Sequence, residues 1–424
     1  MKLMTTTAVL FAAGFAAVPA VAQSYGPSST PQQAPEPRND APAASAQAQG
    51  QGPKINVSAK ATKAVQELQA AVKANDRANI PAKVAAAQAV AQTRDDRFAI
   101  ARLQLDAAFA ANDNAAALTA ADALVASAFL PASDVAGVYT KVGVSAYNAK
   151  QYDQAVGAFQ KAVALNGNDA EAVKFLGMAQ NMAGHKAEAS ATMLRAIQLG
   201  SAGGKKPDED LYKQALTVAY AAKAPTAIEL GRQWVAAYPS PDSWHDALVI
   251  YRSMGNPDPS LALDVMRLTS VTNAMRGTAD YNIYAGETIN SQNYGEAKAL
   301  ISEGLSSGRI KASDPIVQDI QKALAGKSAP TAAELTTRES AAKAPTAFLR
   351  VGDAYYGAGN YQKAAELYRK AIAGGADKNV ANLRLGEALA RAGDKAGATA
   401  ALTAVSGTQA EIAKFWLLYV QRQG

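Results

Sequence analysis

The amino-acid sequence predicts an all-α protein in which about ten helix–turn–helix hairpins follow one another and a last helix caps the stack. Two observations carry this prediction: the alanine content and an internal repeat. Of the 424 residues, 100 are alanine, and aromatic residues make up only 7%. Alanine has the highest helix propensity, and its small side chain allows helices to approach closely. This composition therefore favours closely packed helices.

A period of 34 residues recurs in two parts of the chain. Within each period, small and apolar residues fall at helical spacing in two stripes that a short turn separates, as expected for two antiparallel helices. Glycine or alanine at the same place in each unit allows the two helices of a hairpin to cross closely. A period of this length indicates a helical repeat solenoid. The residues 34 apart are Gly143 and Gly177, Ala155 and Ala189, Phe159 and Met193, Ala162 and Ala196, and Leu165 and Leu199 in the first part, and Gly352 and Gly386, Ala364 and Ala398, Tyr368 and Leu402, and Ala371 and Val405 in the second.

These units resemble the tetratricopeptide repeat. That family has helix–turn–helix units of the same length, with small residues where the helices cross and an aromatic residue in the second helix. The resemblance is strong for the pair of units over 133–200 and the pair over 345–406, and weaker for the degenerate hairpins over 201–344. It implies a right-handed superhelical solenoid in which the first helix of each unit lines a concave groove, and in which the large second-helix residue, such as Phe159, faces the next unit.

The N-terminal segment over 1–22 is expected to be a signal peptide. Lys2 precedes an apolar stretch over 8–18, and Ala20-Val21-Ala22 forms a cleavage signal. The stretch is shorter than the roughly 20 apolar residues that a membrane anchor requires. A lipoprotein would need a cysteine at the cleavage point, and the chain has none. We therefore expect an exported, periplasmic protein that is not inserted in the membrane.

The remaining segments follow in order. Residues 23–53 are rich in Pro and Gln and poor in charge, which predicts a disordered linker. Irregular helical hairpins are expected over 54–132. In the last segment, 407–424, the residues Ile412, Phe415, Trp416 and Tyr419 recur on one helical face. We expect this helix to cap the open edge of the last repeat, in a stack where each repeat contacts only its neighbours.

The composition excludes several kinds of active site. The chain has no cysteine and only two histidines, His185 and His245, which lie 60 residues apart. This excludes thiol and disulfide chemistry and disfavours a histidine metal site. The net charge of +6 arises from 42 basic and 36 acidic residues without a long basic run, which disfavours nucleic-acid binding. We expect no enzyme activity, no catalytic residue, no cofactor and no metal site.

A binding function remains. We expect a non-catalytic periplasmic scaffold that binds a protein or extended peptide of the cell envelope, because Tyr and Met suit such partners. The alternative is a glycan-associated module for polysaccharide export or cell-wall remodelling, in which Tyr residues, Trp234 and Trp244 stack on sugar rings. Exposed aromatic rows would favour glycan, and rows of charged and amide side chains would favour protein. By the family resemblance, the groove candidates are Tyr147, Asn148, Lys174, Met178, Asn181, Tyr212, Tyr220, Asn282, Asn290, Asp353, Tyr356, Arg384 and Arg391.

Overall fold

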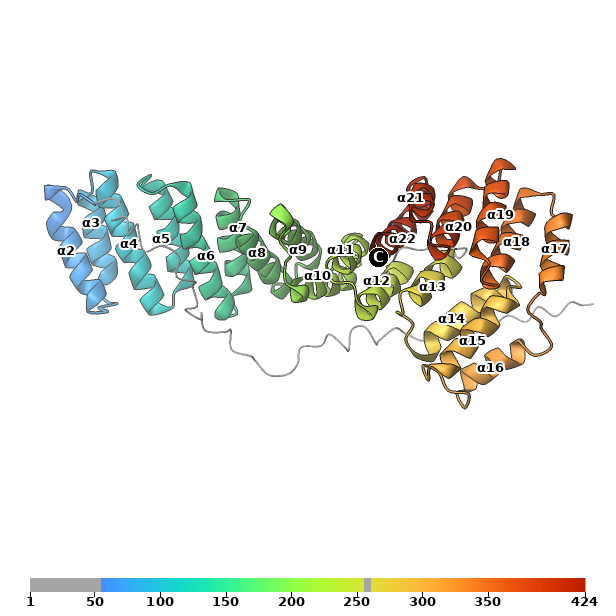
Figure 1. The fold of residues 1–424 in the computed structure, drawn as a ribbon. Coiled ribbons are helices and arrows are strands. Elements are labelled where there is room, and N and C mark those ends of the chain that lie inside the picture. Colours follow the sequence, from blue (N-terminus) through green and yellow to red (C-terminus); the bar gives the residue numbers. More distant parts are fainter. Residues whose placement is uncertain (1–54, 255–260, 424) are drawn as a thin grey trace, which may run out of the picture. The chain divides into compact units, whose positions relative to one another are not determined.

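The structure, a computed structural model, describes residues 55–254 and 261–423. The expected signal peptide over 1–22 and the linker over 23–53 lie outside the described residues. The described residues belong to one compact unit. In the described part of this unit every regular element is a helix, and 21 α-helices pack largely as consecutive pairs (Figure 1). The predicted all-α solenoid is confirmed.

The helices fall into an N-terminal run of hairpins and a C-terminal group. The N-terminal hairpins are α2 (Ala59–Lys73) with α3 (Ile80–Val90), α4 (Arg94–Ala111) with α5 (Asn114–Ala126), α6 (Ala132–Asn148) with α7 (Tyr152–Leu165), α8 (Ala170–Met182) with α9 (Lys186–Gly200), and α10 (Glu209–Ala221) with α11 (Thr226–Ala237). The C-terminal helices are α12 (Pro241–Met254), α13 (Ala262–Val271), α14 (Gly277–Asn290), α15 (Tyr294–Ser306), α16 (Pro315–Ala323), α17 (Ala332–Ala341), α18 (Pro345–Gly357), α19 (Tyr361–Ala373), α20 (Lys378–Arg391), α21 (Lys395–Thr403) and α22 (Ala410–Arg422).

The repeated glycines lie where the two helices of a hairpin cross. A Cβ atom added to Gly143 would lie 2.7 Å from the ring of Phe159, and one added to Gly352 would lie 2.6 Å from the ring of Tyr368. Both rings are fully buried. Phe159 also stacks on Phe175 of the next hairpin, with 5.6 Å between ring centroids. The large residue of the second helix therefore fills the space that its own glycine leaves, in addition to facing the next repeat as predicted.

The turn inside each hairpin also repeats. Lys150 and Gly184 occupy the same position of two successive units and have φ values of +60° and +89°. Gly359 and Gly393 do the same in the C-terminal pair, with φ values of +79° and +82°. Glycine adopts this left-handed conformation without the Cβ penalty, which explains its use at three of the four turns. One left-handed residue thus ends each first helix and directs the chain into the second.

The last helix does more than cap the final repeat. α22 packs on α20 and α21, as the sequence predicts, but it also contacts α11 and α13, which lie far earlier in the chain (Figure 1). The indole N–H of buried Trp416 donates to the carbonyl of Asp264 at 3.4 Å. The ring of Phe415 lies 6.3 Å from that of Trp244. The expectation that repeats contact only their neighbours is therefore wrong for the C-terminal group, because α22 joins its end to its beginning.

Helix α13 lies in the interior of this C-terminal group. Seven consecutive residues, 263–269, are buried, so the helix has no solvent-facing side over this stretch. A helix that is buried all round normally carries apolar residues only. This one carries Asp264 and Arg267, both fully buried. These two charges form part of a polar cluster inside the molecule.

Candidate functional site

The N-terminal hairpins present a surface along their first helices, which we call the first-helix face. It consists of Tyr147 on α6, Lys174, Met178 and Asn181 on α8, and Tyr220 on α10, all of them half-buried. Helix α6 contacts α8, so the first helices of these two repeats adjoin directly. The structure therefore brings these predicted groove residues onto neighbouring elements.

The middle of this face combines apolar and charged groups. Met182, one turn beyond Met178, is 47% exposed, which is unusual for a large apolar side chain. The ammonium group of Lys174 lies 2.8 Å from the Glu171 carboxylate and 5.2 Å from the centroid of the Phe175 ring. Lys174 is thus held against α8 while part of its side chain stays accessible. Burial raises the pKa of Tyr147, which keeps its hydroxyl neutral and able to donate a hydrogen bond.

The other predicted residues lie apart from this face. Tyr212 on α10 is 3% exposed and packs in the core, so it cannot be a groove residue as predicted. Asn148, at the end of α6, and Asn282 and Asn290 on α14 are exposed. Arg391 is exposed at the end of α20, where its guanidinium donates to the Tyr361 hydroxyl at 2.7 Å.

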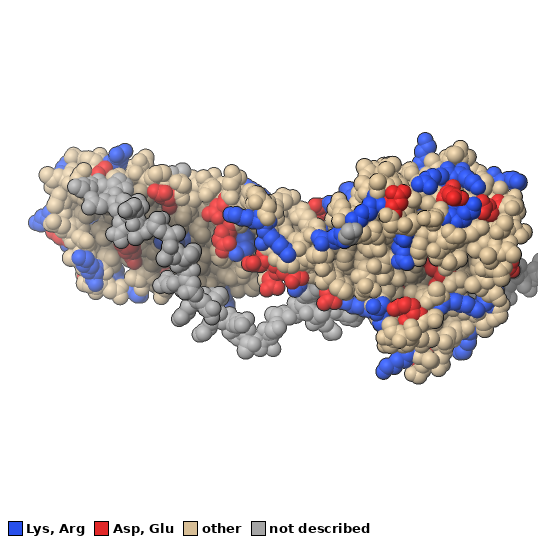
Figure 2. All heavy atoms as spheres, viewed as in Figure 1, with Lys and Arg blue, Asp and Glu red and all other residues tan. Residues whose placement is uncertain are grey.

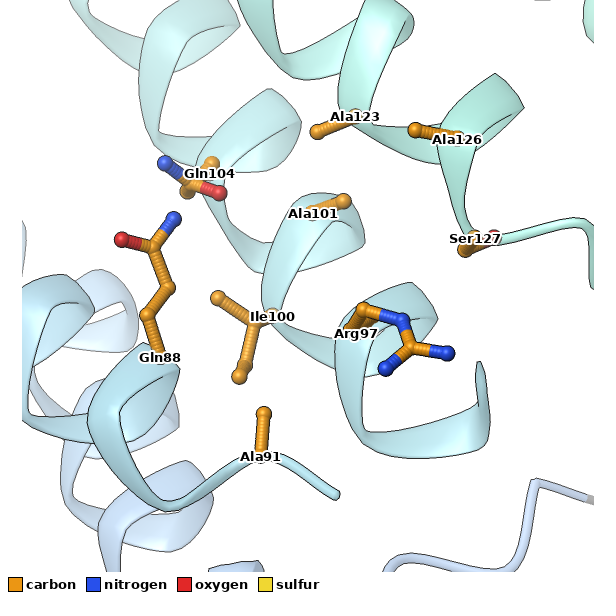
Figure 3. Close-up of a pocket in the computed structure, with 9 residues that line it drawn as sticks. All are labelled: Gln88, Ala91, Arg97, Ile100, Ala101, Gln104, Ala123, Ala126 and Ser127. Carbon is orange, nitrogen blue, oxygen red and sulfur yellow. The ribbon is translucent and has the colours of Figure 1, made fainter. Parts of the chain in front are cut away.

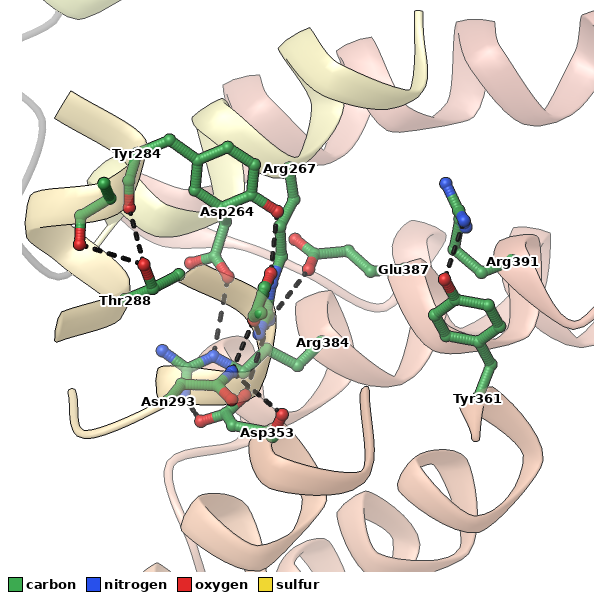
Figure 4. Close-up of polar contacts among 12 residues, drawn as sticks. Asp264, Arg267, Tyr284, Thr288, Asn293, Asp353, Tyr361, Arg384, Glu387 and Arg391 are labelled. Carbon is green, nitrogen blue, oxygen red and sulfur yellow. Dashed lines mark hydrogen bonds and ion pairs between the residues drawn. The ribbon is translucent and has the colours of Figure 1, made fainter. Parts of the chain in front are cut away.

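Six charged side chains meet inside the C-terminal group, and we call them the interior charge cluster (Figure 4). The Arg267 guanidinium pairs with both carboxylate oxygens of Glu296 at 2.9 Å each and lies 3.4 Å from Asp353. The Arg384 guanidinium donates to the other oxygen of Asp353 at 2.7 Å. Such two-pronged guanidinium–carboxylate pairs are strong and directional. The cluster consists of Asp264 and Arg267 on α13, Glu296 on α15, Asp353 on α18, and Arg384 and Glu387 on α20.

Tyrosines complete the inner contacts of this cluster. The Tyr284 hydroxyl donates to Glu296 at 2.7 Å, and the Tyr368 hydroxyl donates to Asp353 at 2.8 Å. The Arg267 guanidinium also lies 4.0 Å from the centroid of the Tyr356 ring, a cation–π contact. The negative charges of Glu296 and Asp353 are therefore balanced by guanidinium groups and hydrogen bonds.

Two carboxylates of the cluster are left without hydrogen bonds. Neither oxygen of Asp264 nor of Glu387 has a hydrogen-bond partner among the described residues. Arg384 approaches Asp264 at 3.5 Å, and Arg267 approaches Glu387 at 3.5 Å. Burial raises the pKa of both carboxyls, because it disfavours their charged form more than the two guanidiniums favour it. Protonation of both would leave two carboxylates against two guanidiniums in the interior.

The interior charge cluster corrects part of the predicted groove. Asp353 and Tyr356, expected to line the groove, are 8% and 5% exposed. Arg384, whose side chain is 15% exposed, is occupied by Asp353. The cause is that Arg267 of α13 pairs with Asp353 of α18 and Glu387 of α20, where a partner was expected. The chain itself fills this part of the groove.

A cavity of about 570 Å³ opens beside the cluster. It lies between the turn that joins α14 to α15 and the helices α17, α18 and α20. Its charged lining comprises Arg338, Arg350, Arg384 and Asp353. Ser291, Gln292 and Asn293 add hydroxyl and amide groups on the turn, and small apolar residues make up the rest.

A second, smaller cavity of about 230 Å³ lies between α3, α4 and α5 (Figure 3). The amide groups of Gln88 and Gln104 face one another across it, and Arg97 lies on its other side. Most of the remaining lining is alanine. The Gln104 carbonyl oxygen is buried without a partner among the described residues, a group that a water molecule would satisfy. The hydroxyl of Ser127, which also lines the cavity, donates to the Leu124 carbonyl at 2.6 Å.

Within the described residues, no group of three or more histidine, cysteine, aspartate or glutamate side chains is placed to hold a metal ion. In the same part of the chain, no helix is long and apolar enough to cross a membrane. On the face shown in Figure 2, Lys and Arg side chains are interspersed with Asp and Glu. His185 is exposed in a hairpin turn. His245 lies 3.0 Å from Asp246 and 3.4 Å from Asp280, a structural ion-pair group that the sequence did not reveal.

Sequence reasoning missed the residues that α13 and α15 add to the interior. Asp264, Arg267 and Glu296 were not among the candidates. A signal was present: in Leu261-Ala262-Leu263-Asp264-Val265-Met266-Arg267-Leu268, two opposite charges three residues apart interrupt an apolar run. Charges in such a run must be paired if the helix is buried. Their partners lie up to 120 residues away, which no local pattern reveals.

Comparison with known proteins gives matches to repeat families. Family models described as tetratricopeptide repeat match residues 142–204 and residues 345–373. No curated protein matches the sequence. Among solved structures, the maize pentatricopeptide repeat protein PPR10 aligns with 86% of this chain and 57% of its own, at 15% identity and a TM-score of 0.26. A monomeric mutant of IFIT1 with Gppp-AAAA aligns with 82% of this chain and 66% of its own, at 12% identity and a TM-score of 0.21. The chain thus spans 57% and 66% of the lengths of these two proteins.

Proposed function

We propose that this tetratricopeptide-type repeat protein is an exported, periplasmic scaffold that binds a protein or extended peptide of the cell envelope. Repeats of this type indicate a protein-interaction scaffold, and both segments matched by the family models carry them. The first-helix face is the surface that we assign to the partner. The proposal of export rests on the signal-peptide pattern over 1–22. Intact-mass measurement of the secreted protein tests it, and the expected mass is that of a chain beginning at residue 23.

One observation carries the choice of this face: its side chains stay partly exposed, whereas Asp353 and Tyr356 on the corresponding C-terminal helix are buried. In the C-terminal repeats, α15 packs against the first helix α18, and Arg267 of α13 pairs with Asp353 of α18 and Glu387 of α20. In the N-terminal repeats, Met178 and Tyr220 remain half-buried on the corresponding helices, and Met182 is 47% exposed. An exposed methionine beside tyrosine offers an adaptable apolar contact for a peptide.

The composition of the face supports a protein partner over a glycan. Trp234 and Trp244, the residues that would stack on sugar rings, are buried in the core. Lys174 and Asn181, which lie about two turns apart on α8, add a charge and an amide that suit a peptide backbone and its side chains. Together with Met178 they form one continuous stripe.

Capture of a partner from an envelope extract by the purified chain, followed by mass spectrometry, tests the proposal. Replacing Lys174, Met178 and Asn181 together by Ala should weaken capture by roughly tenfold or more if one of them is a hot spot. Alanine preserves the helix, so the circular dichroism spectrum should not change.

The matched control is the triple replacement of Lys186, Leu194 and Gln198 by Ala on α9. It removes the same kinds of groups from the second helix of the same hairpin: a lysine, a half-buried apolar residue and an amide. Capture by this control variant should equal that of the unaltered chain. Equal capture by all three proteins would show that the first-helix face is not the binding surface.

A further inference from the structure

We infer that His245 is a pH-sensitive link between helices α12 and α14, which holds α14 in place while its imidazole ring is protonated and weakens when the ring loses its proton. The inference concerns the fold itself and does not depend on the proposed binding function. We call His245, Asp246, Arg276 and Asp280 the histidine bridge.

Both ring nitrogens of His245 face carboxylates. Nδ1 lies 3.0 Å from Asp246, the next residue of α12, and Nε2 lies 3.4 Å from Asp280 on α14. The His245 side chain is 13% exposed and the two aspartate side chains are 6% exposed, so water competes little for these contacts. An imidazolium donates from both nitrogens, whereas a neutral imidazole donates from one and presents a lone pair at the other. Only the protonated ring can therefore donate to both carboxylates at once.

Arg276 completes the bridge from the turn before α14. Its guanidinium lies 3.0 Å from Asp246, and its backbone N–H donates to Asp280 at 2.7 Å. Each carboxylate thus keeps a contact with Arg276 when the imidazole is neutral, and titration changes the direct contact that His245 makes between α12 and α14. The charged groups at this junction, on α12, in the turn and on α14, are Asp242, Asp246, Arg252, Arg276 and Asp280.

The direction of the pH effect follows from the balance of these contacts. Burial disfavours the charged form of His245, but its hydrogen bonds to Asp246 and Asp280 outweigh burial and raise its pKa. A raised pKa in the folded state means that the stabilisation is complete below the unfolded-state value of about 6.5. It is then lost as the pH rises through the folded-state pKa of His245. The bridge is therefore closed under mildly acidic conditions and weakened under alkaline ones.

Helix α14 transmits this change to other parts of the C-terminal group. It packs against α15 and α16. Tyr284 of α14 donates to Glu296 of the interior charge cluster at 2.7 Å, and Thr278 donates to Asp314, directly before α16, at 2.9 Å. On the other side of the bridge, α12 packs on α11 of the N-terminal run. Protonation of His245 therefore fixes α14, and with it α15 and α16, to the helix that continues the N-terminal run.

NMR titration of the imidazole Cε1–H resonances in the full chain tests the bridge directly. The chain has only two histidines, and the variant His185→Gln assigns their two resonances. The His245 titration midpoint should lie above the midpoint of the same residue in the urea-denatured chain, and Asp280→Asn should lower it. A folded-state midpoint at or below the denatured-state value, or one that Asp280→Asn leaves unchanged, would overturn the inference.

Amide hydrogen exchange over the range of about pH 5–8, corrected for the intrinsic pH dependence of exchange, measures the consequence for α14. Protection of α14 should fall as the pH rises in the unaltered chain and in His185→Gln, the matched control, since His185 is exposed in a hairpin turn. The fall should be smaller in His245→Gln, because glutamine keeps hydrogen-bonding groups but cannot be protonated. Glu287 on α14 also has a raised pKa, caused by burial, but it is present in all three proteins, so the difference between them isolates His245.

The two measurements must agree in size. Linkage requires the fold-change in protection that His245 causes to equal the ratio of its acid dissociation constants in the denatured and folded chains, both of which the NMR titration supplies. A fall in protection that is the same in His245→Gln and the unaltered chain would show that the bridge does not control α14. If His245→Gln does not fold, the titration of the unaltered chain and of Asp280→Asn still decides the inference.

Discussion

Replacing Gly143 by Ala should destabilise the α6–α7 hairpin, although alanine is the better helix former. A Cβ atom at this position would lie 2.7 Å from Cε1 of Phe159 and 2.8 Å from two further ring carbons. Ordinary carbon contacts are about 3.5–4.0 Å. The ring cannot retreat freely, because it is fully buried and stacks on Phe175. Helix α6 or the ring must therefore shift.

The size of the effect follows from a comparison within the same helix. Gly137 also lies in α6, but a Cβ atom there would have nothing within 4 Å. Both replacements gain the same helix propensity, about 0.8–1 kcal/mol. The difference in the free energy of unfolding between the two variants is then the strain of overpacking alone, about 1–3 kcal/mol. We expect Gly137→Ala to be more stable than the unaltered chain, and Gly143→Ala to be less stable.

Amide hydrogen exchange in α6 and α7 measures the local free energy of opening for each variant. This local readout is needed because repeat arrays do not always unfold in a single transition. The double variant Gly143→Ala with Phe159→Leu should recover part of the loss, because a smaller side chain then faces the new methyl group. Protection of α7 amides in Gly143→Ala equal to that in Gly137→Ala would refute the crossing argument.

Three further predictions concern closure and charge. Deleting residues 410–424 should speed amide exchange in α11, α13 and α21, because α22 contacts each of these helices, and it should leave exchange in α2–α5 unchanged. Faster exchange in α21 alone would contradict this prediction. Burial disfavours the charged form of Asp96, but four hydrogen bonds from Ser58, Gln92 and Thr93 outweigh this effect and lower the pKa of Asp96. The stability that ionised Asp96 adds to the fold is therefore complete above pH of about 4 and is lost as the pH falls. Asp96→Asn should lower the free energy of unfolding by about 1–3 kcal/mol near neutral pH and make the acid unfolding of α2–α4, followed by hydrogen exchange, less dependent on pH. Asp264 and Glu387 have the opposite effect: because their pKa is raised, their contribution to stability is complete below about pH 4 and falls as the pH rises through the folded-state pKa. The double variant Asp264→Asn with Glu387→Gln should therefore remove this loss of stability at higher pH in α13 and α20. A hydrogen-exchange pH profile equal to that of the unaltered chain would refute this prediction.

The hairpins could be predicted from the sequence because their determinants are local. The spacing of Gly143 and Phe159 within one unit, and its recurrence at Gly177 and Met193, states which side chains meet across a hairpin. The turn residues obey the same period. A repeat interface uses residues less than about 40 apart, so a single chain of 34-residue units displays nearly all of it.

The closure of the C-terminal group could not be predicted because its determinants are distant and individually unremarkable. Arg267 meets Glu387 across 120 residues, and Trp416 reaches the carbonyl of Asp264 across 152. A tryptophan on the apolar face of a terminal helix is equally compatible with a simple cap. The sequence therefore predicted the terminal helix α22 correctly but not its contacts with α11 and α13. It also assigned Asp353 to a groove that the chain itself occupies.

Filling of one groove by the chain's own helices divides the solenoid into two kinds of surface. In the C-terminal group, Arg267 pairs with Glu296 and Asp353, and Arg384 pairs with Asp353, so a partner would have to displace a buried ion-pair network. Breaking such a network by removing one partner costs about 3–5 kcal/mol. The first-helix face around Met178 requires no such displacement. Binding at the first-helix face therefore leaves the interior charge cluster intact, which is why replacements on that face should change affinity without unfolding the C-terminal group.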